Sequence, residues 1–272
     1  MKKVIRQIVL LILSLVTFFP LLWMITNSFK STETIMRNPL NLMPDFFDFR
    51  NFIGALTLAP FDLYIINSVI TAFFIVALQL LFGILFAYGL YRFKFKGSNF
   101  LFNLVLLTYM LPAAATYVPS YVILSRLGLI DSLTGIIVSN SVAVFTIYML
   151  YTSFKQVPKE LIEAAQIDGA SNWQILWKVV VPFCKSTILT NALIQFVTMY
   201  NNYMWPSLIT NTKSKYLISV GLNKFFTSQG NFGQNLPLLM AGNTISVLPL
   251  LIIFVVLQKY FIKGLSDSGI KG

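Results

Sequence analysis

Six long apolar stretches, separated by polar segments, constrain the fold of this chain more than any other feature. A helix needs about 20 apolar residues to cross the hydrocarbon core of a bilayer. Hydrophobic residues make up 57% of the sequence and charged residues only 11%, a composition unlike that of a soluble domain. We therefore expect an all-α, polytopic membrane protein with six transmembrane helices. The stretches lie at residues 8–26, 64–90, 99–124, 134–152, 183–208 and 240–261.

The first apolar stretch follows three basic residues, Lys2, Lys3 and Arg6, as the apolar region of a secretory signal peptide would. It is longer than that region usually is, and no cleavage site of the small-x-small type follows it. We therefore interpret residues 8–26 as a membrane anchor, kinked near Pro20.

The distribution of Lys and Arg predicts the orientation of the helices. Basic residues accumulate in cytoplasmic connections, and 13 of the 20 fall in one set of connections. We therefore expect a multi-pass protein of the cell membrane with both termini in the cytoplasm. The formal net charge of +11 then reflects topology and contact with anionic membrane lipids, and no nucleic-acid motif is present. The cytoplasmic set is Lys2, Lys3, Arg6, Arg92, Lys94, Lys96, Lys155, Lys159, Lys178, Lys185, Lys259, Lys263 and Lys271.

Ionisable residues are missing from most of the apolar stretches. Residues 64–90, 99–124, 134–152 and 187–208 contain no Asp, Glu, Lys or Arg, whereas ion-coupled carriers usually bind their driving ion with such residues. The chain also has no His, the commonest metal ligand and proton carrier. We therefore expect no metal site and no enzymatic site. A secondary carrier remains open, because Na⁺ can bind to neutral carbonyl oxygens.

One long polar segment, residues 163–182, lies on the predicted cytoplasmic side. Its pattern predicts two short helices that meet at a sharp corner. Pro158 suits the first turn of the first helix, and Gly169 can end that helix because glycine adopts the left-handed conformation without steric cost. Ser171 and Gln174 form a capping-box pattern for the second helix.

The surface of this segment is typical of a docking element for another protein. Ala164 and Ala165 leave one face nearly flat, so a partner could approach the backbone closely. Glu163 adds a charge beside that face, Asp168 precedes the corner, and Pro182 marks the start of the next span.

The fifth apolar stretch carries a polar stripe. Asn191, Gln195, Thr198 and Asn202 are spaced as one face of a helix, with Trp205 near its outer end. Amide groups and an aromatic ring suit a neutral, hydroxyl-rich solute such as a sugar. The same side chains also hold membrane helices together, so both interpretations stay open.

Two loops on the predicted outer side, residues 27–62 and 209–239, are long. The second contains Lys213, Lys215 and Lys224 and no acidic residue. It is either an ordinary solvated loop or a surface that meets a partner or an anionic solute.

The docking element resembles the EAA loop of binding-protein-dependent ABC importer permeases. Glu163-Ala164-Ala165 is followed after three residues by Gly169, and after nine more by Val179-x-Val181-Pro182. The Ile and Leu usual near the end of the motif are both Val here. Further stretches at 28–35, 87–97, 127–138, 201–211 and 257–272 resemble the carbohydrate-uptake branch, which includes the maltose-importer type and the glycerol-phosphate permeases.

This resemblance implies the type I ABC importer permease fold and a defined set of partners. These are a second homologous permease, two cytoplasmic ATPases that close on ATP, and an extracellular solute-binding protein. It implies coupling roles for Glu163, Ala164, Ala165, Asp168, Gly169 and Pro182, and contact with the ATPases for a tail that includes Lys263, Gly264 and Lys271. It further divides the chain into 1–62 (cytoplasmic segment, first helix and external loop), 63–263 (permease core, coupling helices at about 158–181) and 264–272 (cytoplasmic tail).

The expected function is uptake of a sugar or oligosaccharide by alternating access. No Walker motif occurs in the chain, so we expect it to bind no cofactor and to leave ATP and Mg²⁺ to the partner ATPases. Import of glycerol-3-phosphate or an acidic sugar is the alternative, motivated by the lysine-only outer loop. An ion-coupled secondary carrier is the remoter one, and a membrane enzyme ranks last.

Overall fold

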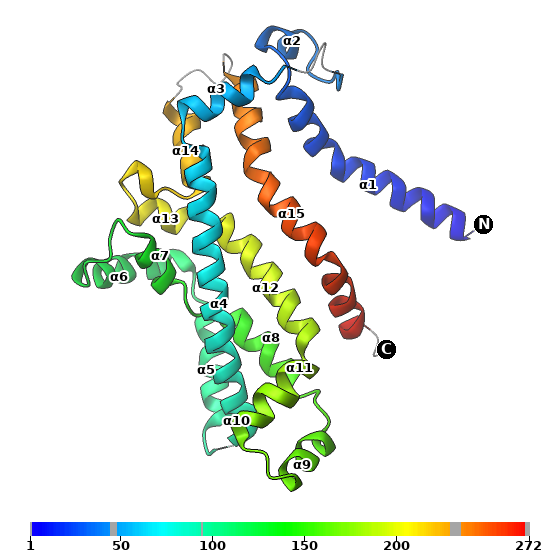
Figure 1. The fold of residues 1–272 in the computed structure, drawn as a ribbon, viewed down its shortest axis with the longest axis vertical. Helices are drawn as coiled ribbons and strands as arrows, with labels where there is room; N and C mark the ends of the chain where they lie inside the picture. The colour runs from blue at the N-terminus through cyan, green and yellow to red at the C-terminus, as the bar shows by residue number, and fades with distance from the viewer. Residues whose placement is uncertain (1, 44–47, 94, 229–234, 270–272) are drawn as a thin grey trace. The chain divides into compact units, whose positions relative to one another are not determined.

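The computed structural model describes residues 2–43, 48–93, 95–228 and 235–269, and every regular element within them is a helix (Figure 1). The all-α prediction is thereby confirmed. In chain order the elements are α1 (Lys2–Asn27), α2 (Thr32–Arg37), α3 (Arg50–Leu58), α4 (Phe61–Phe93), α5 (Ser98–Tyr109), α6 (Ala113–Arg126), α7 (Leu133–Ser139), α8 (Val144–Phe154), α9 (Lys159–Ile167), α10 (Asn172–Ile175), the π-helical η1 (Leu176–Val180), α11 (Val181–Phe183), α12 (Lys185–Tyr200), α13 (Met204–Ile209), the 3₁₀ turn η2 (Lys213–Lys215), α14 (Ile218–Ser228) and α15 (Leu236–Gly269).

All six predicted apolar stretches are mainly helical. Three correspond to single helices long and apolar enough to cross a membrane, within α1, α4 and α15. The other three overlap bent pairs, with bends of 98° between α5 and α6, 44° between α7 and α8, and 76° between α10–α11 and α12. The last pair runs from Asn172 to Tyr200, so it begins before the predicted stretch at 183–208 and also ends before that stretch does. The six-span prediction therefore agrees with the structure when each bent pair forms one span, although the sequence analysis did not foresee the bends.

Local chemistry explains two of these breaks. Pro112 precedes α6 in an extended conformation, and its ring and missing N–H prevent continuation of α5. After α7, the Asn140 side chain donates to the backbone carbonyl of Ile136 (2.8 Å) and so competes with the helical pattern. The Gln79 amide of α4 donates to the carbonyl of Asn140 (2.8 Å), which satisfies a backbone group that the break leaves free.

The chain divides into two compact units. The first comprises residues 1–66 and 218–249. Within it, the Phe61 and Phe225 rings pack edge to face at 5.3 Å. Gly221 lies so close to the Tyr64 ring that a Cβ would stand 2.2 Å from it. Asn51 of α3 donates to the carbonyls of Ser28 and Lys30 (both 2.9 Å), which ties the end of α1 to α3.

The second unit comprises residues 67–217 and 250–272 and holds the functional candidates. Its larger core packs the second half of α4 against α8, α9, α10 and η1. Gly83 of α4 allows close approach of α8, because a Cβ there would stand 2.8 Å from the Thr146 methyl. The buried members of this core are Ile84, Ala87, Tyr88, Leu90, Leu150, Tyr151, Phe154, Val157, Ile162, Ile175, Leu176, Val180 and Cys184.

The loops before α7 and after α13 are joined by one carboxylate, which we call the Asp131 clamp. Asp131 accepts hydrogen bonds from the backbone N–H groups of Asn211 (2.8 Å) and Thr212 (2.9 Å) and from the Thr212 hydroxyl. Lys215 forms a salt bridge with it at 3.3 Å. The Thr212 hydroxyl and these backbone donors hold the pKa of the Asp131 carboxyl well below its usual range.

Candidate functional site

The candidate site is the coupling element, residues 158–182, which lies within the second unit. Its first helix, α9, follows Pro158 and is held by a single buried side chain, Ile162. Burial of an Ile side chain stabilises by about 1.5–3 kcal/mol. The rest of α9 is open: Glu163 and Ala164 are exposed and Ala165 is partly buried. The helix therefore has one anchoring residue and a free outer face.

The corner after α9 has the predicted conformation. Gly169 adopts a φ of +79°, and a Cβ on it would meet no atom within 4 Å. Glycine is therefore favoured by the left-handed backbone and not by crowding. The N–H of Ala170 donates to the carbonyl of Ala165 (2.9 Å) and that of Asp168 to Ala164 (3.0 Å), which closes the end of the helix.

The second helix begins with the predicted capping box. The Ser171 hydroxyl accepts from the N–H of Gln174 (3.3 Å), and the Gln174 side chain accepts from the N–H of Ser171 (2.8 Å). The helix then widens into η1, where the N–H of Val181 donates to Leu176, five residues back. Pro182 lies inside α11, two residues before the bend at Cys184 that separates α11 from α12.

Two hydrogen bonds fix the second helix to α4. The Arg92 Nε donates to Asn172 Oδ1 (2.9 Å), and the Tyr88 hydroxyl donates to the Asn172 carbonyl (3.1 Å). Ile175 and Leu176, each 1% exposed, pack beneath them. From the sequence, Arg92 indicates only topology, and neither Asn172 nor Tyr88 stands out. Only a contact between distant segments identifies them.

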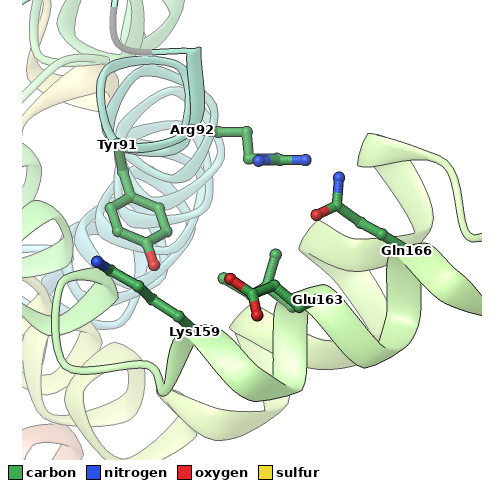
Figure 2. Close-up of a pocket in the computed structure, with 6 residues that line it drawn as sticks. Tyr91, Arg92, Lys159, Glu163 and Gln166 are labelled. Atoms are coloured by element: carbon green, nitrogen blue, oxygen red, sulfur yellow. The ribbon is translucent and has the colours of Figure 1, made fainter.

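Glu163 faces a small cavity of about 160 Å³ between α9 and the end of α4. Figure 2 shows its carboxylate and the Arg92 guanidinium bordering this space, with the Gln166 amide beside them. Within the described part of the chain, the Glu163 carboxylate takes part in none of the salt bridges, which join Arg37 to Glu33, Arg50 to Asp48 and Lys215 to Asp131. The cavity is lined by Tyr91, Arg92, Lys159, Ile162, Glu163 and Gln166.

Two large apolar side chains near the corner are exposed. Ile167 is 87% exposed and Trp173 61% exposed, one on each side of the corner. Large apolar side chains clustered next to a polar surface mark an interaction site. Ala164 on α9 is exposed as well, so this part of the chain presents an apolar surface to its surroundings.

The polar stripe is divided by the structure. Asn191 and Gln195 are buried on α12 and meet the same residue of α8, Thr146. The Thr146 hydroxyl donates to Asn191 Oδ1 (2.9 Å), and Gln195 Nε2 donates to the Thr146 hydroxyl (3.3 Å). These bonds favour a packing role for the two amides.

The remaining stripe residues have other surroundings. Thr198 is exposed, and Asn202 is partly buried just beyond the end of α12. Trp205 lies on α13, where its indole donates to the Ser139 hydroxyl (2.8 Å) and stacks on Tyr117 at 5.5 Å. The five candidates therefore do not share one continuous helical face, since α12 ends at Tyr200.

The predicted tail contacts lie at the limit of the described residues. Lys263 and Gly264 belong to the helical backbone of α15, and Lys271 falls outside the described residues.

Comparison with known proteins agrees with this arrangement. Residues 79–267 match the family of binding-protein-dependent transport system inner membrane components. The arabinooligosaccharides transport system permease protein of Halalkalibacterium halodurans is 32% identical over 263 residues, covering 96% of this chain and 93% of the relative. The sn-glycerol-3-phosphate transport system permease protein of Yersinia pestis is 29% identical over 272 residues, covering 96% and 95%.

A solved structure supports the same assignment of fold. It is a bacterial ABC transporter involved in the import of the acidic polysaccharide alginate. One chain of it superposes with a TM-score of 0.82 and 25% identity, covering 95% of this chain and 96% of that chain. The chain therefore belongs to the family of inner membrane components of binding-protein-dependent transport systems.

Proposed function

We propose that this chain is the permease subunit of an ABC importer that takes up a sugar or oligosaccharide. The observation that carries the proposal is the coupling element. Its buried side chains pack in the core of the second unit, and the Glu163 carboxylate forms none of the described salt bridges. Ile162, Ile175 and Leu176 hold it to the core. Glu163 and the exposed Ile167 are available to contact another protein. A basic surface with an apolar cleft fits this combination, and we assign it to a cytoplasmic ATPase.

We propose that the contacts of the coupling element transmit the movement of the ATPases to the membrane helices. When two ATPases close on ATP, displacement of α9 would reach α10 through the hydrogen-bonded corner at Gly169. From α10 it would pass to α4 through the hydrogen bonds of Arg92 and Tyr88 to Asn172. A second homologous permease and an extracellular solute-binding protein complete the proposed assembly, with both termini of this chain in the cytoplasm.

The solute path is proposed to use the less buried members of the polar stripe. Asn191, Gln195 and Trp205 are buried and hydrogen-bonded to side chains of other helices. Thr198 and Asn202 are the less buried members, so we assign contact with hydroxyl groups of the solute to these two.

Import of glycerol-3-phosphate or an acidic sugar is the second candidate. The names of the Yersinia pestis relative and of the alginate importer favour it. Against it, Lys215 of the outer loop donates to the Asp131 carbonyl (2.6 Å) and pairs with the Asp131 carboxylate. One of the three loop lysines is therefore already engaged by an internal anion.

Reconstitution into liposomes tests the proposal. The purified assembly, with ATP enclosed and the binding protein outside, should accumulate a labelled oligosaccharide, and accumulation should stop without ATP. Accumulation that follows an imposed Na⁺ or proton gradient without ATP would instead establish an ion-coupled carrier. Competition by sn-glycerol-3-phosphate or an alginate fragment distinguishes the second candidate.

A further inference from the structure

A second, larger cavity adjoins the coupling element on the other side of Tyr91. Its volume is about 630 Å³, and it lies between the end of α4, the start of α5, the end of α8 and the start of α9. Three of its lining residues are aliphatic or phenyl side chains, Leu90, Phe95 and Val157. The others are Gly97 and the polar residues Lys155, Lys159, Ser98, Asn99, Tyr91 and Tyr151. Every charged residue among those lining it is a lysine.

The two lysines are available to an anion. The Lys155 ammonium lies 4.2 Å from the centroid of the Tyr151 ring, a contact that holds its position without neutralising its charge. Neither Lys155 nor Lys159 takes part in the salt bridges found within the described residues. The cavity thus presents two ammonium groups together with apolar side chains.

The cavity lies at the end of α4, a helix long and apolar enough to cross a membrane. α4 ends at Phe93 and α5 begins at Ser98, and the aromatic side chains around this turn face outward. Phe93 is 59% exposed, Phe95 47% and Phe100 72%. Exposed rings at the end of a span are suited to lipid, and the cytoplasmic orientation proposed above places them at the leaflet that carries anionic lipids.

We propose that this cavity binds the phosphate headgroup of an anionic phospholipid. Two ammonium groups and nearby hydroxyl groups suit a phosphodiester, and the apolar side chains suit the glycerol and first acyl carbons. Its volume falls in the range of about 300–1,000 Å³ typical of pockets that enclose a whole organic ligand, which exceeds the needs of free phosphate. Because Lys159 is the first residue of α9, a bound headgroup would also tether the coupling element to the membrane surface.

The test is lipid binding by the full-length chain in detergent micelles. Binding of phosphatidylglycerol and of phosphatidylcholine is compared for the unmodified chain, for Lys155→Gln/Lys159→Gln and for a matched control, Lys178→Gln/Lys185→Gln. The control removes the same charge from the same predicted side of the membrane. Each basic residue near an anionic lipid surface contributes about fivefold in affinity, so the cavity pair should lose about 25-fold for phosphatidylglycerol, and the control should lose far less.

Three results would overturn the proposal. Equal losses in both double variants would show diffuse attraction to anionic lipid. Inorganic phosphate that binds as tightly as phosphatidylglycerol would show a site for a free anion. An acidic peptide that binds while neither lipid does would show a site for a protein. Lys155→Arg/Lys159→Arg keeps both positive charges and should keep phosphatidylglycerol binding, which excludes a folding defect as the cause of the loss in Lys155→Gln/Lys159→Gln. The inference rests on the proposed orientation, so cleavage of the α8–α9 connection by an added protease is measured separately. Cleavage from outside the cell contradicts both the proposed function and the lipid site. Cleavage from the cytoplasmic side, together with equal binding of the two lipids, contradicts only the lipid site.

Discussion

Two carboxylates of the second unit, Asp131 and Glu163, have opposite surroundings. Asp131 receives two backbone N–H groups, a hydroxyl and an ammonium group from the loop after α13. Glu163 lies on an exposed helix and takes part in none of the described salt bridges. A saturated carboxylate stabilises its own chain, whereas an unpaired carboxylate on an anchored helix can bind a cation of another protein without first losing an internal partner.

The largest expected effect follows from reversing the free charge. In the proposed complex, Glu163→Lys places like charges together, which costs several kcal/mol. Transport should therefore fall by at least about 100-fold, while membrane insertion stays normal. Glu160→Lys, the same change on an exposed position of the same helix, is the control. Normal ATPase binding by Glu163→Lys would refute the coupling role.

A bulky residue at the corner should have a nearly equal effect. Gly169 has a φ of +79°, a conformation that costs other residues about 1–2 kcal/mol, so Gly169→Leu should misorient α9 and abolish uptake. Gly128→Leu is the matched control, because it has a φ of +67° and equally open surroundings but lies outside the coupling element. Equal uptake by the two variants would contradict the account.

An intermediate effect is expected from the link to α4. Arg92→Ala removes the hydrogen bond to Asn172, which contributes about 1 kcal/mol. The number of solute molecules imported per ATP should fall about fivefold, with ATP hydrolysis maintained. Lys96→Ala serves as the charge-matched control. A parallel loss of hydrolysis and transport would place Arg92 in general folding and not in transmission.

The Asp131 clamp should affect stability and leave coupling unchanged. The pKa of Asp131 in the folded chain lies below its ordinary value of 3.8, so the clamp stabilises fully above that value and weakens as the pH falls below it. The unfolding temperature should therefore lose this contribution on acidification below about pH 4. Asp131→Asn should lower the unfolding temperature at pH 7 and flatten the acid response, unlike Asp62→Asn. An unchanged acid response would show that the clamp contributes nothing.

The smallest effects concern the polar stripe. Gln195→Leu loses a hydrogen bond to Thr146, worth about 0.6 kcal/mol in membrane helices, and should lower stability slightly with KM unchanged. Asn202→Leu should instead raise KM for the solute. Reversed results would assign Gln195 to the solute path and Asn202 to packing.

Much of the coupling element could be predicted because its determinants are local. The conformation of Gly169 and the capping box of Ser171 and Gln174 depend on neighbouring residues, and both agree with the structure. The six apolar stretches likewise follow from composition over a single window.

The anchoring contacts could not be predicted in this way. Arg92 and Asn172 are separated by 80 residues, and Asp131 and Thr212 by 81, so periodicity within a helix carries no trace of either pair. The predicted polar stripe also runs beyond the end of the helix that carries it, for a related reason. Residues 191–205 keep helical spacing in the sequence, but the helix ends at Tyr200, and Trp205 packs against α7 through Ser139.

Crosslinking of the coupling element tests the central claim most directly. Cys184 is the only cysteine of the chain and is buried, so Ala164→Cys in a Cys184→Ser background supplies one exposed thiol. In inside-out vesicles this thiol should crosslink to an ATPase subunit, and in intact cells it should resist reagents that cannot cross the membrane. Labelling from outside, or ATP-independent accumulation of solute by the purified chain alone, would contradict the account.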